Sequence, residues 1–223
     1  MSKKLEGQVV VVMGATPAAG AKAVATQGTF TTSDLMSRKN LGDVVEPITV
    51  ESVNGSSVSI PPKDGFLHLQ FRRFAGCPIC NLHLRSFIRR HDELLVHGIH
   101  EVAVFHSPKS AMLEYQTSGP FPFIADPDKT LYKAFGVETS ILSVLNPRTW
   151  PAAIKGIFRT RPRLPSRGES ALGLPADFLI DTSGKIVALK YGKHASDHWE
   201  FDELLELVRA AGKDTVASAP AND

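Results

Sequence analysis

Two cysteines, Cys77 and Cys80, are the residues of this chain best suited to do chemistry. They are the only cysteines among 223 residues, and two residues separate them. A thiolate is a nucleophile and a metal ligand, and in a CxxC pair one thiol can react while the other resolves the mixed disulfide. So short a loop constrains the unfolded chain little, which argues against a purely structural disulfide. The spacing therefore predicts redox or metal chemistry.

The segments on both sides of the pair predict where it lies. Residues 66–71 are mostly apolar and predict a buried central strand. Residues 82–95 repeat apolar side chains at helical spacing among charged ones, which predicts an amphipathic helix. Cys77 should then lie at the helix N-terminus, where free N–H groups favour a thiolate, with Cys80 one turn inside. Pro78 fits the first turn, where its missing N–H costs nothing.

Three further side chains are candidates for tuning the thiol. Arg72 and Arg73 precede the pair and would lower the pKa of Cys77 if they turn toward it. His83 follows Cys80 by three residues, so we expect it on the same helix as a polar group that tunes or protonates the thiol.

The same spacing leaves a metal site open as an alternative. Cys77, Cys80 and His83 form a C-x2-C-x2-H pattern, for which His68 or His106 could supply a fourth ligand. Structural zinc usually takes two separated pairs of ligands, and this chain has no second pair. We therefore expect no metal.

The rest of the chain predicts an α/β fold. Asn54-Gly55 between two alternating runs is a strong hairpin signal. Strand-like and helix-like segments then alternate, which favours a sheet with right-handed crossovers. The expected elements are strands at 44–50, 57–60, 66–71 and 99–105, a helix capped at Ser107-Pro108, a strand or extended loop at 121–126, a helix at 128–135, a hairpin of 176–181 with 185–191, and a helix at 201–211 ended by Gly212.

Composition bounds the function classes. Hydrophobic residues make up 43% and charged residues 22%, which is typical of a globular protein. A net charge of +2 does not point to nucleic acid, and no apolar run approaches the roughly 20 residues of a membrane-spanning helix. The N-terminus imitates a signal peptide only loosely, because Glu6 and Gln8 interrupt its apolar run. We expect a cytoplasmic protein that binds neither nucleic acid nor membrane.

Three regions are expected along the chain. Residues 1–33 form an N-terminal extension, partly disordered, whose valine run and Gly-rich turn lack a complete dinucleotide fingerprint. Residues 34–212 form the main domain, and residues 213–223 a flexible tail.

Two smaller features lie late in the main domain. Residues 150–158 are compatible with a helix, and four arginines in residues 159–167 predict a solvated loop, with an anion or partner site as the alternative. His194 and His198 flank Asp197, and we expect them to cap the last helix rather than to approach the cysteines.

Several spaced blocks resemble one family. Residues 74–84, 104–107, 125–127 and 174–181 are similar to the peroxiredoxin-like, AhpC/TSA-type redoxins. The resemblance spans roughly residues 40–211 and leaves out the first 33. It implies a thioredoxin-like fold, with a central mixed sheet flanked by helices and an N-terminal β-hairpin.

The resemblance also implies an activity. Cys77 would reduce a peroxide or similar small oxidant and Cys80 would resolve it, giving an antioxidant oxidoreductase. No bound cofactor is implied, and an external thiol reductant such as thioredoxin or glutathione is expected as the partner, with a homodimer left open. The alternatives are a thioredoxin-like protein disulfide oxidoreductase and a non-catalytic redox-sensing or binding protein on the same fold.

The chain departs from the family's pattern at two places. Where the family carries P-x-x-x-T-x-x-C, this chain has Gln70 for the proline and Phe74 for the threonine. Where the family's later arginine is expected, residues 172–175 read Leu-Gly-Leu-Pro. Pro175 itself resembles the cis-proline that thioredoxins place opposite the CxxC pair, so we expect a cis bond there.

Overall fold

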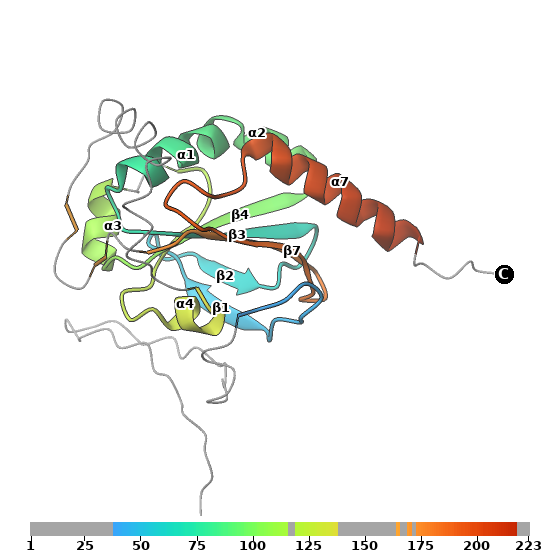
Figure 1. The fold of residues 1–223 in the computed structure, drawn as a ribbon, viewed down its shortest axis with the longest axis horizontal. Coiled ribbons are helices and arrows are strands. Elements are labelled where there is room, and N and C mark those ends of the chain that lie inside the picture. Colours follow the sequence, from blue (N-terminus) through green and yellow to red (C-terminus); the bar gives the residue numbers. More distant parts are fainter. Residues whose placement is uncertain (1–37, 116–118, 138–163, 166–168, 171–172, 218–223) are drawn as a thin grey trace, which may run out of the picture.

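The computed structural model describes residues 38–115, 119–137, 164–165, 169–170 and 173–217 (Figure 1). Its elements are β1 (Ile48–Glu51), β2 (Ser57–Ile60), β3 (Phe66–Arg72), α1 (Pro78–Arg89), α2 (His91–Val96), β4 (Ile99–Phe105), α3 (Lys109–Tyr115), β5 (Phe123–Ala125), α4 (Thr130–Ala134), β6 (Ala176–Asp181), β7 (Ile186–Tyr191) and α7 (Phe201–Ala217).

A five-stranded mixed sheet forms the centre of the domain. Its strand order is β5-β4-β3-β6-β7. The strand β3 is central, parallel to β4 on one side and antiparallel to β6 on the other. This confirms the predicted mixed sheet and the buried central strand before the cysteines.

Helices α1, α2 and α7 cover one face of the sheet, and α4 lies on the other face with the β1–β2 hairpin (Figure 1). Apolar side chains of β3 alternate in the way that a pleated strand requires. Leu67, Leu69 and Phe71 belong to the core on the α4 side. Phe87 of α1 and Leu204 of α7 belong to the core on the opposite side.

The N-terminal hairpin is present as predicted. The strands β1 and β2 pair antiparallel, from Ile48 opposite Ile60 to Glu51 opposite Ser57. Gly55 in the turn has a φ of 84°, which a glycine adopts without strain. The pair is a separate two-stranded sheet.

Three helix predictions need correction. The helix after Cys80 is interrupted at Arg90, whose ψ of 22° is not helical, so α1 and α2 are separate. The last helix does not end at Gly212 but continues to Ala217. A helical glycine costs only about 1 kcal/mol relative to alanine, so it need not end a helix. Ser107 does not cap α3, because the helix begins at Lys109 and its first carbonyl acceptor is that of Pro108, which accepts from the backbone N–H of Met112 at 3.1 Å.

Several predictions lie outside the described residues. These are the extension at residues 1–33, the helix at 150–158 and all but two residues of the arginine-rich segment 159–167. The division into extension, domain and tail therefore stays a prediction. Within the described part of the chain, no helix is both long enough and apolar enough to span a membrane.

Candidate functional site

The ends of two parallel strands bring the candidate site together. Because β3 and β4 are parallel, the residues that follow them lie at the same edge of the sheet. The backbone N–H of His106, after β4, donates to the carbonyl oxygen of Arg73, after β3, at 3.2 Å. Gly173 lies against both, since a Cβ there would be 3.5 Å from Cγ of Arg73 and 3.6 Å from Nε2 of His106.

A tight loop joins β3 to α1 and orients Cys77. Gly76 has a φ of 78°, a conformation in which a residue with a side chain is strained. The backbone N–H of Cys77 donates to the carbonyl oxygen of Phe74 at 3.1 Å. The backbone N–H of Ala75 donates to Oγ of Ser107 at 2.8 Å, which attaches the loop to the end of β4.

Three donors converge on the sulfur of Cys77. This residue is the N-cap of α1, followed by Pro78 in the first turn. Its Sγ accepts from the backbone N–H of Cys80 at 3.4 Å, from the thiol of Cys80 at 2.8 Å and from Nη2 of Arg73 at 3.3 Å. Both cysteines are free thiols. This is the donor arrangement that stabilises a thiolate at Cys77.

The two thiols titrate as a pair because they are hydrogen-bonded to each other. Burial alone would raise the pKa of Cys80, but its hydrogen bond with Cys77 and the charge of Arg73 lower that pKa to about 6. Burial and the neighbouring Cys80 hold the pKa of Cys77 well above its usual value. The pair therefore loses one proton near pH 6 and keeps the second. The sulfurs are 2.8 Å apart, so the remaining proton lies between them and the negative charge belongs to the pair.

Both sulfurs lie inside the protein. The exposed fraction is 0% for Cys77 and 3% for Cys80. Phe74 and Arg73 are buried beside them, at 4% and 5%. A reactive cysteine ordinarily needs partial exposure, so an oxidant reaches this pair only if it is small or if the surrounding chain opens.

Arg72 does not turn toward the thiols, in contrast to Arg73. It is buried, and its Nη2 donates to Oδ1 of Asp177 at 2.7 Å. The same nitrogen donates to Gln70, and Gln70 donates to Glu101. His68 completes the buried network, with Nδ1 2.9 Å from Glu101 and Nε2 3.3 Å from Asp177. Side chains alternate along a strand, so neighbouring arginines at its end face different ways.

The buried network is charged at neutral pH. Burial alone would lower the pKa of His68, but the charge of Glu101 and hydrogen bonds with Asp177 and Glu101 raise it to about 9. Burial alone would raise the pKa of Asp177, but Arg72 and His68 hold it well below its usual range. Arg72 also contributes to lowering the pKa of Cys80 through its charge.

His83 does not hydrogen-bond to a thiol. Its Nε2 is 2.8 Å from the carbonyl oxygen of Trp199, and its ring lies 3.5 Å from that of His198, centroid to centroid. Burial and the neighbouring His198 hold the pKa of His83 well below 6.5. His198 is itself buried and packs on His83. The prediction that it caps the last helix is wrong.

Pro175 does not have the expected cis bond. Among the described residues the cis peptide bond is Ile60–Pro61, so Leu174–Pro175 is trans. The Pro175 carbonyl oxygen accepts from the backbone N–H of Gly192 at 2.9 Å. A trans proline is a common first residue of a strand, and Pro175 directly precedes β6 in this way.

His106 and Ser107 lie at this edge of the sheet, where the sequence suggested His106 only as a fourth metal ligand and Ser107 only as a helix cap. His106 is buried, stacks on Tyr132, and neither ring nitrogen has a hydrogen-bond partner. Burial and Lys129 lower its pKa to about 4, so the ring is neutral. Ser107 accepts from Ala75 and donates to Glu169. The available signal was their position directly after a predicted strand parallel to the one before Cys77.

Comparisons with known proteins agree with this architecture. A family model described as AhpC/TSA antioxidant enzyme matches residues 83–194, which is half of the chain and begins after Cys80. No curated protein sequence matches the chain.

Two peroxiredoxin structures are similar in fold. Plasmodium vivax 2-Cys peroxiredoxin in its reduced form has a TM-score of 0.58 at 16% identity, covering 82% of this chain and 88% of that one. Peroxidoxin BcpB from Mycobacterium tuberculosis has a TM-score of 0.57 at 19% identity, covering 76% and 96%. The fold is therefore thioredoxin-like, as in peroxiredoxins, and the chain belongs to the AhpC/TSA antioxidant enzyme family.

Proposed function

We propose that this protein is a thiol oxidoreductase that reduces a peroxide or similar small oxidant through Cys77 and Cys80. The observation that carries the proposal is the convergence of three donors on Sγ of Cys77, one of them the guanidinium of Arg73. A thiolate held in this way is the reacting form of cysteine. Family membership supports the oxidoreductase class.

The reaction balances with these two residues and a peroxide. The Cys77 thiolate attacks one peroxide oxygen, the O–O bond breaks, and the products are a Cys77 sulfenic acid and an alkoxide or hydroxide, which takes a proton from water. The Cys80 sulfur then attacks the sulfenic sulfur, forming a Cys77–Cys80 disulfide and releasing water. The sulfurs are 2.8 Å apart and must close to about 2.05 Å for this bond.

An external thiol reductant completes the cycle. Two reductant thiols return the disulfide to the dithiol and leave as their own disulfide. Glutathione or a similar small thiol needs only a small opening to reach the pair, whereas thioredoxin needs the surrounding chain to open, and the reaction needs no bound cofactor. A reducing cytoplasm would supply such thiols, and we propose that compartment as the site of action.

Arg73 would take the electrostatic role in this site. Phe74 stands where the family has a hydroxyl residue, so the chain lacks that hydrogen bond to a peroxide. The guanidinium of Arg73 touches Cys77 and would also neutralise charge developing on the departing oxygen. His106, neutral and adjacent to Arg73, is a further polar group at the same edge of the sheet.

Burial of the sulfurs supports a small oxidant over a protein disulfide. A folded protein substrate would have to reach a sulfur with no exposed surface, whereas hydrogen peroxide needs only a small opening. The same burial supports a second candidate, a slow redox sensor that is oxidised without turnover. The rate of thiol oxidation and the number of catalytic turnovers distinguish the enzyme from the sensor.

The test measures the loss of protein thiols and the repeated consumption of peroxide. Reduced protein mixed with one equivalent of hydrogen peroxide should lose both thiols, and Cys77→Ser should leave its remaining thiol intact. Cys80→Ser, which keeps the reacting thiol, should stop at a sulfenic acid that a dimedone probe traps. Repeated consumption of peroxide with an added dithiol supports the enzyme, and a single oxidation without turnover supports the sensor. Thiols that persist in excess peroxide would rule out both.

A further inference from the structure

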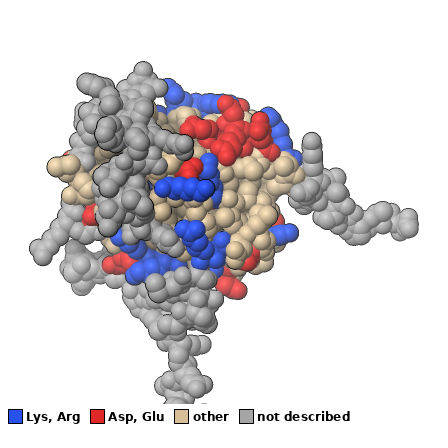
Figure 2. Space-filling model, viewed as in Figure 1, with Lys and Arg blue, Asp and Glu red and all other residues tan. Residues whose placement is uncertain are grey.

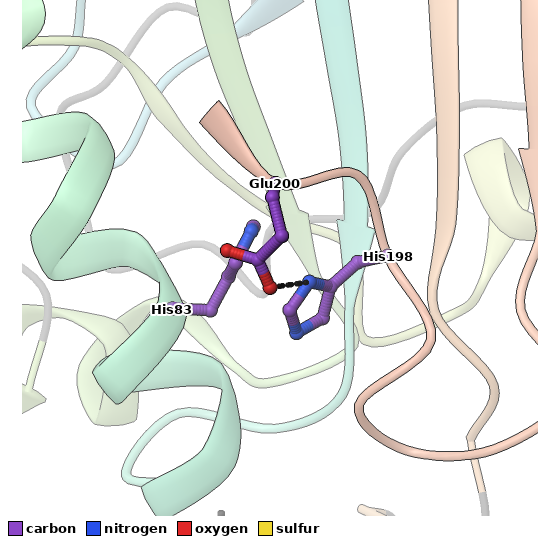
Figure 3. A group of neighbouring side chains, drawn as sticks. All are labelled: His83, His198 and Glu200. Atoms are coloured by element: carbon purple, nitrogen blue, oxygen red, sulfur yellow. Dashed lines mark ion pairs between the residues drawn. The ribbon is translucent and has the colours of Figure 1, made fainter. Parts of the chain in front are cut away.

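Two histidines and one glutamate lie close together between α1 and the loop that leads into α7 (Figure 3). His83 comes from α1, and His198 and Glu200 come from the loop that leads into α7. One ligand atom of each lies within 4.8 Å of the others. The imidazoles are buried, at 6% and 8% exposed, whereas Glu200 is exposed.

The hydrogen bonding of His83 leaves one ring nitrogen available inside this group. Nε2 is 2.8 Å from the carbonyl oxygen of Trp199, which can only accept, so Nε2 carries the proton. Nδ1 is then an unprotonated lone pair, and it is buried without a hydrogen-bond partner. A histidine that ligates a metal ordinarily donates its other N–H to a backbone carbonyl in this way, which sets the tautomer and the ring orientation.

His198 presents a second unsatisfied nitrogen. Its Nδ1 is also buried without a hydrogen-bond partner. Oε1 of Glu200 is 3.8 Å away from that nitrogen, too far for a hydrogen bond. Figure 3 marks this pair, which is an ion pair only when the imidazole is protonated. Two buried ring nitrogens without hydrogen-bond partners, on rings 3.5 Å apart centroid to centroid, are costly unless something binds them.

We propose that His83, His198 and Glu200 bind a divalent transition-metal ion of the Zn²⁺ type. Two imidazole nitrogens and one carboxylate oxygen are a common protein ligand set for zinc, with the fourth position left to water. Donor atoms around a tetrahedral zinc lie about 3.4 Å apart for bonds of about 2.0–2.1 Å. Rotation of the exposed Glu200 side chain can bring its carboxylate closer to the two imidazoles.

Charges of both signs surround the site. Acidic side chains gather where α7 begins (Figure 2), where Asp202 pairs with Arg90 and Glu203 lies 3.6 Å from Lys190. The buried cation Arg72 is paired with Asp177 at 2.7 Å. The site differs from the C-x2-C-x2-H alternative suggested by the sequence, because it uses His83 but neither cysteine.

Metal binding would join two elements of the thiol region. His83 lies one turn after Cys80 on α1, and the other two ligands precede α7. An ion bound there would fasten the loop before α7 onto α1 and stabilise the folded chain by mass action. It would do so without changing the number of free thiols.

The test uses full-length reduced protein freed of metal by a chelator and then titrated with Co²⁺, a coloured substitute for zinc. We expect one equivalent to bind with visible bands of a nitrogen–oxygen site and without the intense near-ultraviolet band of a thiolate ligand. Zn²⁺ should displace the colour and raise the melting temperature. The Cys77→Ser, Cys80→Ser double variant should give the same spectrum.

Two ligand variants and one matched control decide the outcome. Glu200→Gln, at an exposed position, and His198→Gln should each weaken Co²⁺ binding by at least the roughly 10–100-fold that loss of a second-shell partner costs. His100→Gln changes another imidazole–carboxylate pair, with Asp64 on the surface, and should leave binding unchanged. A thiolate band that disappears in the double variant would overturn the proposal, as would equal affinity in all single variants. Absence of binding would also overturn it, and would assign the two nitrogens to buried water.

Discussion

Nη2 of Arg73 lies 3.3 Å from Sγ of Cys77, and both side chains are buried. An ion pair of a guanidinium and a thiolate inside a protein is much less screened than one on the surface. Phe74, next to Arg73, brings no hydroxyl to this loop. The behaviour of the thiol pair should therefore depend strongly on this one arginine.

Replacing Arg73 by glutamine should raise the pH at which the pair loses its first proton. A hydrogen bond to a charged group contributes about 1.5–3 kcal/mol, which corresponds to roughly 1–2 pKa units. The oxidation rate at pH 7 should fall by about two- to tenfold, because the thiolate fraction at that pH falls by this factor. Ultraviolet thiolate absorbance against pH measures the shift. Arg85→Gln, an exposed arginine on α1, is the matched control, and an equal shift in both variants would contradict the role of Arg73.

The rate of thiol oxidation should rise with pH through about 6 and then level off, because the pair loses its first proton there. A free cysteine would show the same rise near its ordinary pKa of about 8.5. At neutral pH the Cys77–Cys80 pair therefore holds more thiolate than a free cysteine does. Initial rates with hydrogen peroxide across the pH range give the profile. A rise centred in the ordinary thiol range would mean that the hydrogen bonds to Cys77 do not stabilise its thiolate.

His68 should make the free energy of unfolding fall as the pH rises into the alkaline range. Its pKa is raised to about 9 in the folded protein from 6.5, so its contribution is complete below pH 6.5 and is lost as pH rises through about 9. The shift corresponds to roughly 3 kcal/mol at most. Urea unfolding of the native protein and of His68→Gln should differ most below pH 6.5 and converge above pH 9. A constant difference would show that the ring is not charged in the folded state.

Replacing Asp177 by alanine should destabilise the protein severely. The change leaves Arg72 buried without its 2.7 Å ion-pair partner, and breaking a buried pair costs about 3–5 kcal/mol. Asp202→Ala removes an exposed partner of Arg90 and should change the free energy of unfolding little. Urea unfolding at neutral pH measures both. Similar small effects would show that Arg72 finds another partner or that water reaches it.

Gly76→Ala should weaken both the fold and the thiol reaction. The φ of 78° places an alanine in the left-handed region, at a cost of about 1–2 kcal/mol, and the residue is adjacent to Cys77. Gly212→Ala is the opposite case. No heavy atom lies within 4 Å of the added Cβ in α7, so the change should stabilise by about 1 kcal/mol without altering reactivity. Thermal melting and peroxide oxidation rates test the pair together.

Much of the fold was predictable because its signals are local. The CxxC pair after an apolar run, Asn54-Gly55 between two short strands, and Pro78 at the start of a helix each act within a few residues. Periodicity identified β3 as a buried strand for the same reason. Local signals failed where their energy is small, as at Gly212, which α7 continues through.

The sequence by itself determined which residues could do thiol chemistry and which elements carry them. Only the tertiary structure decided which arginine meets Cys77, because the choice depends on the direction in which each side chain leaves the end of β3. It also decided that His83 faces His198 rather than a thiol, and that the Leu174–Pro175 bond is trans. The Arg72–Asp177 and His83–His198 contacts join residues far apart in the chain. The free energy of such contacts comes from burial and packing between elements, which no local pattern of residues encodes.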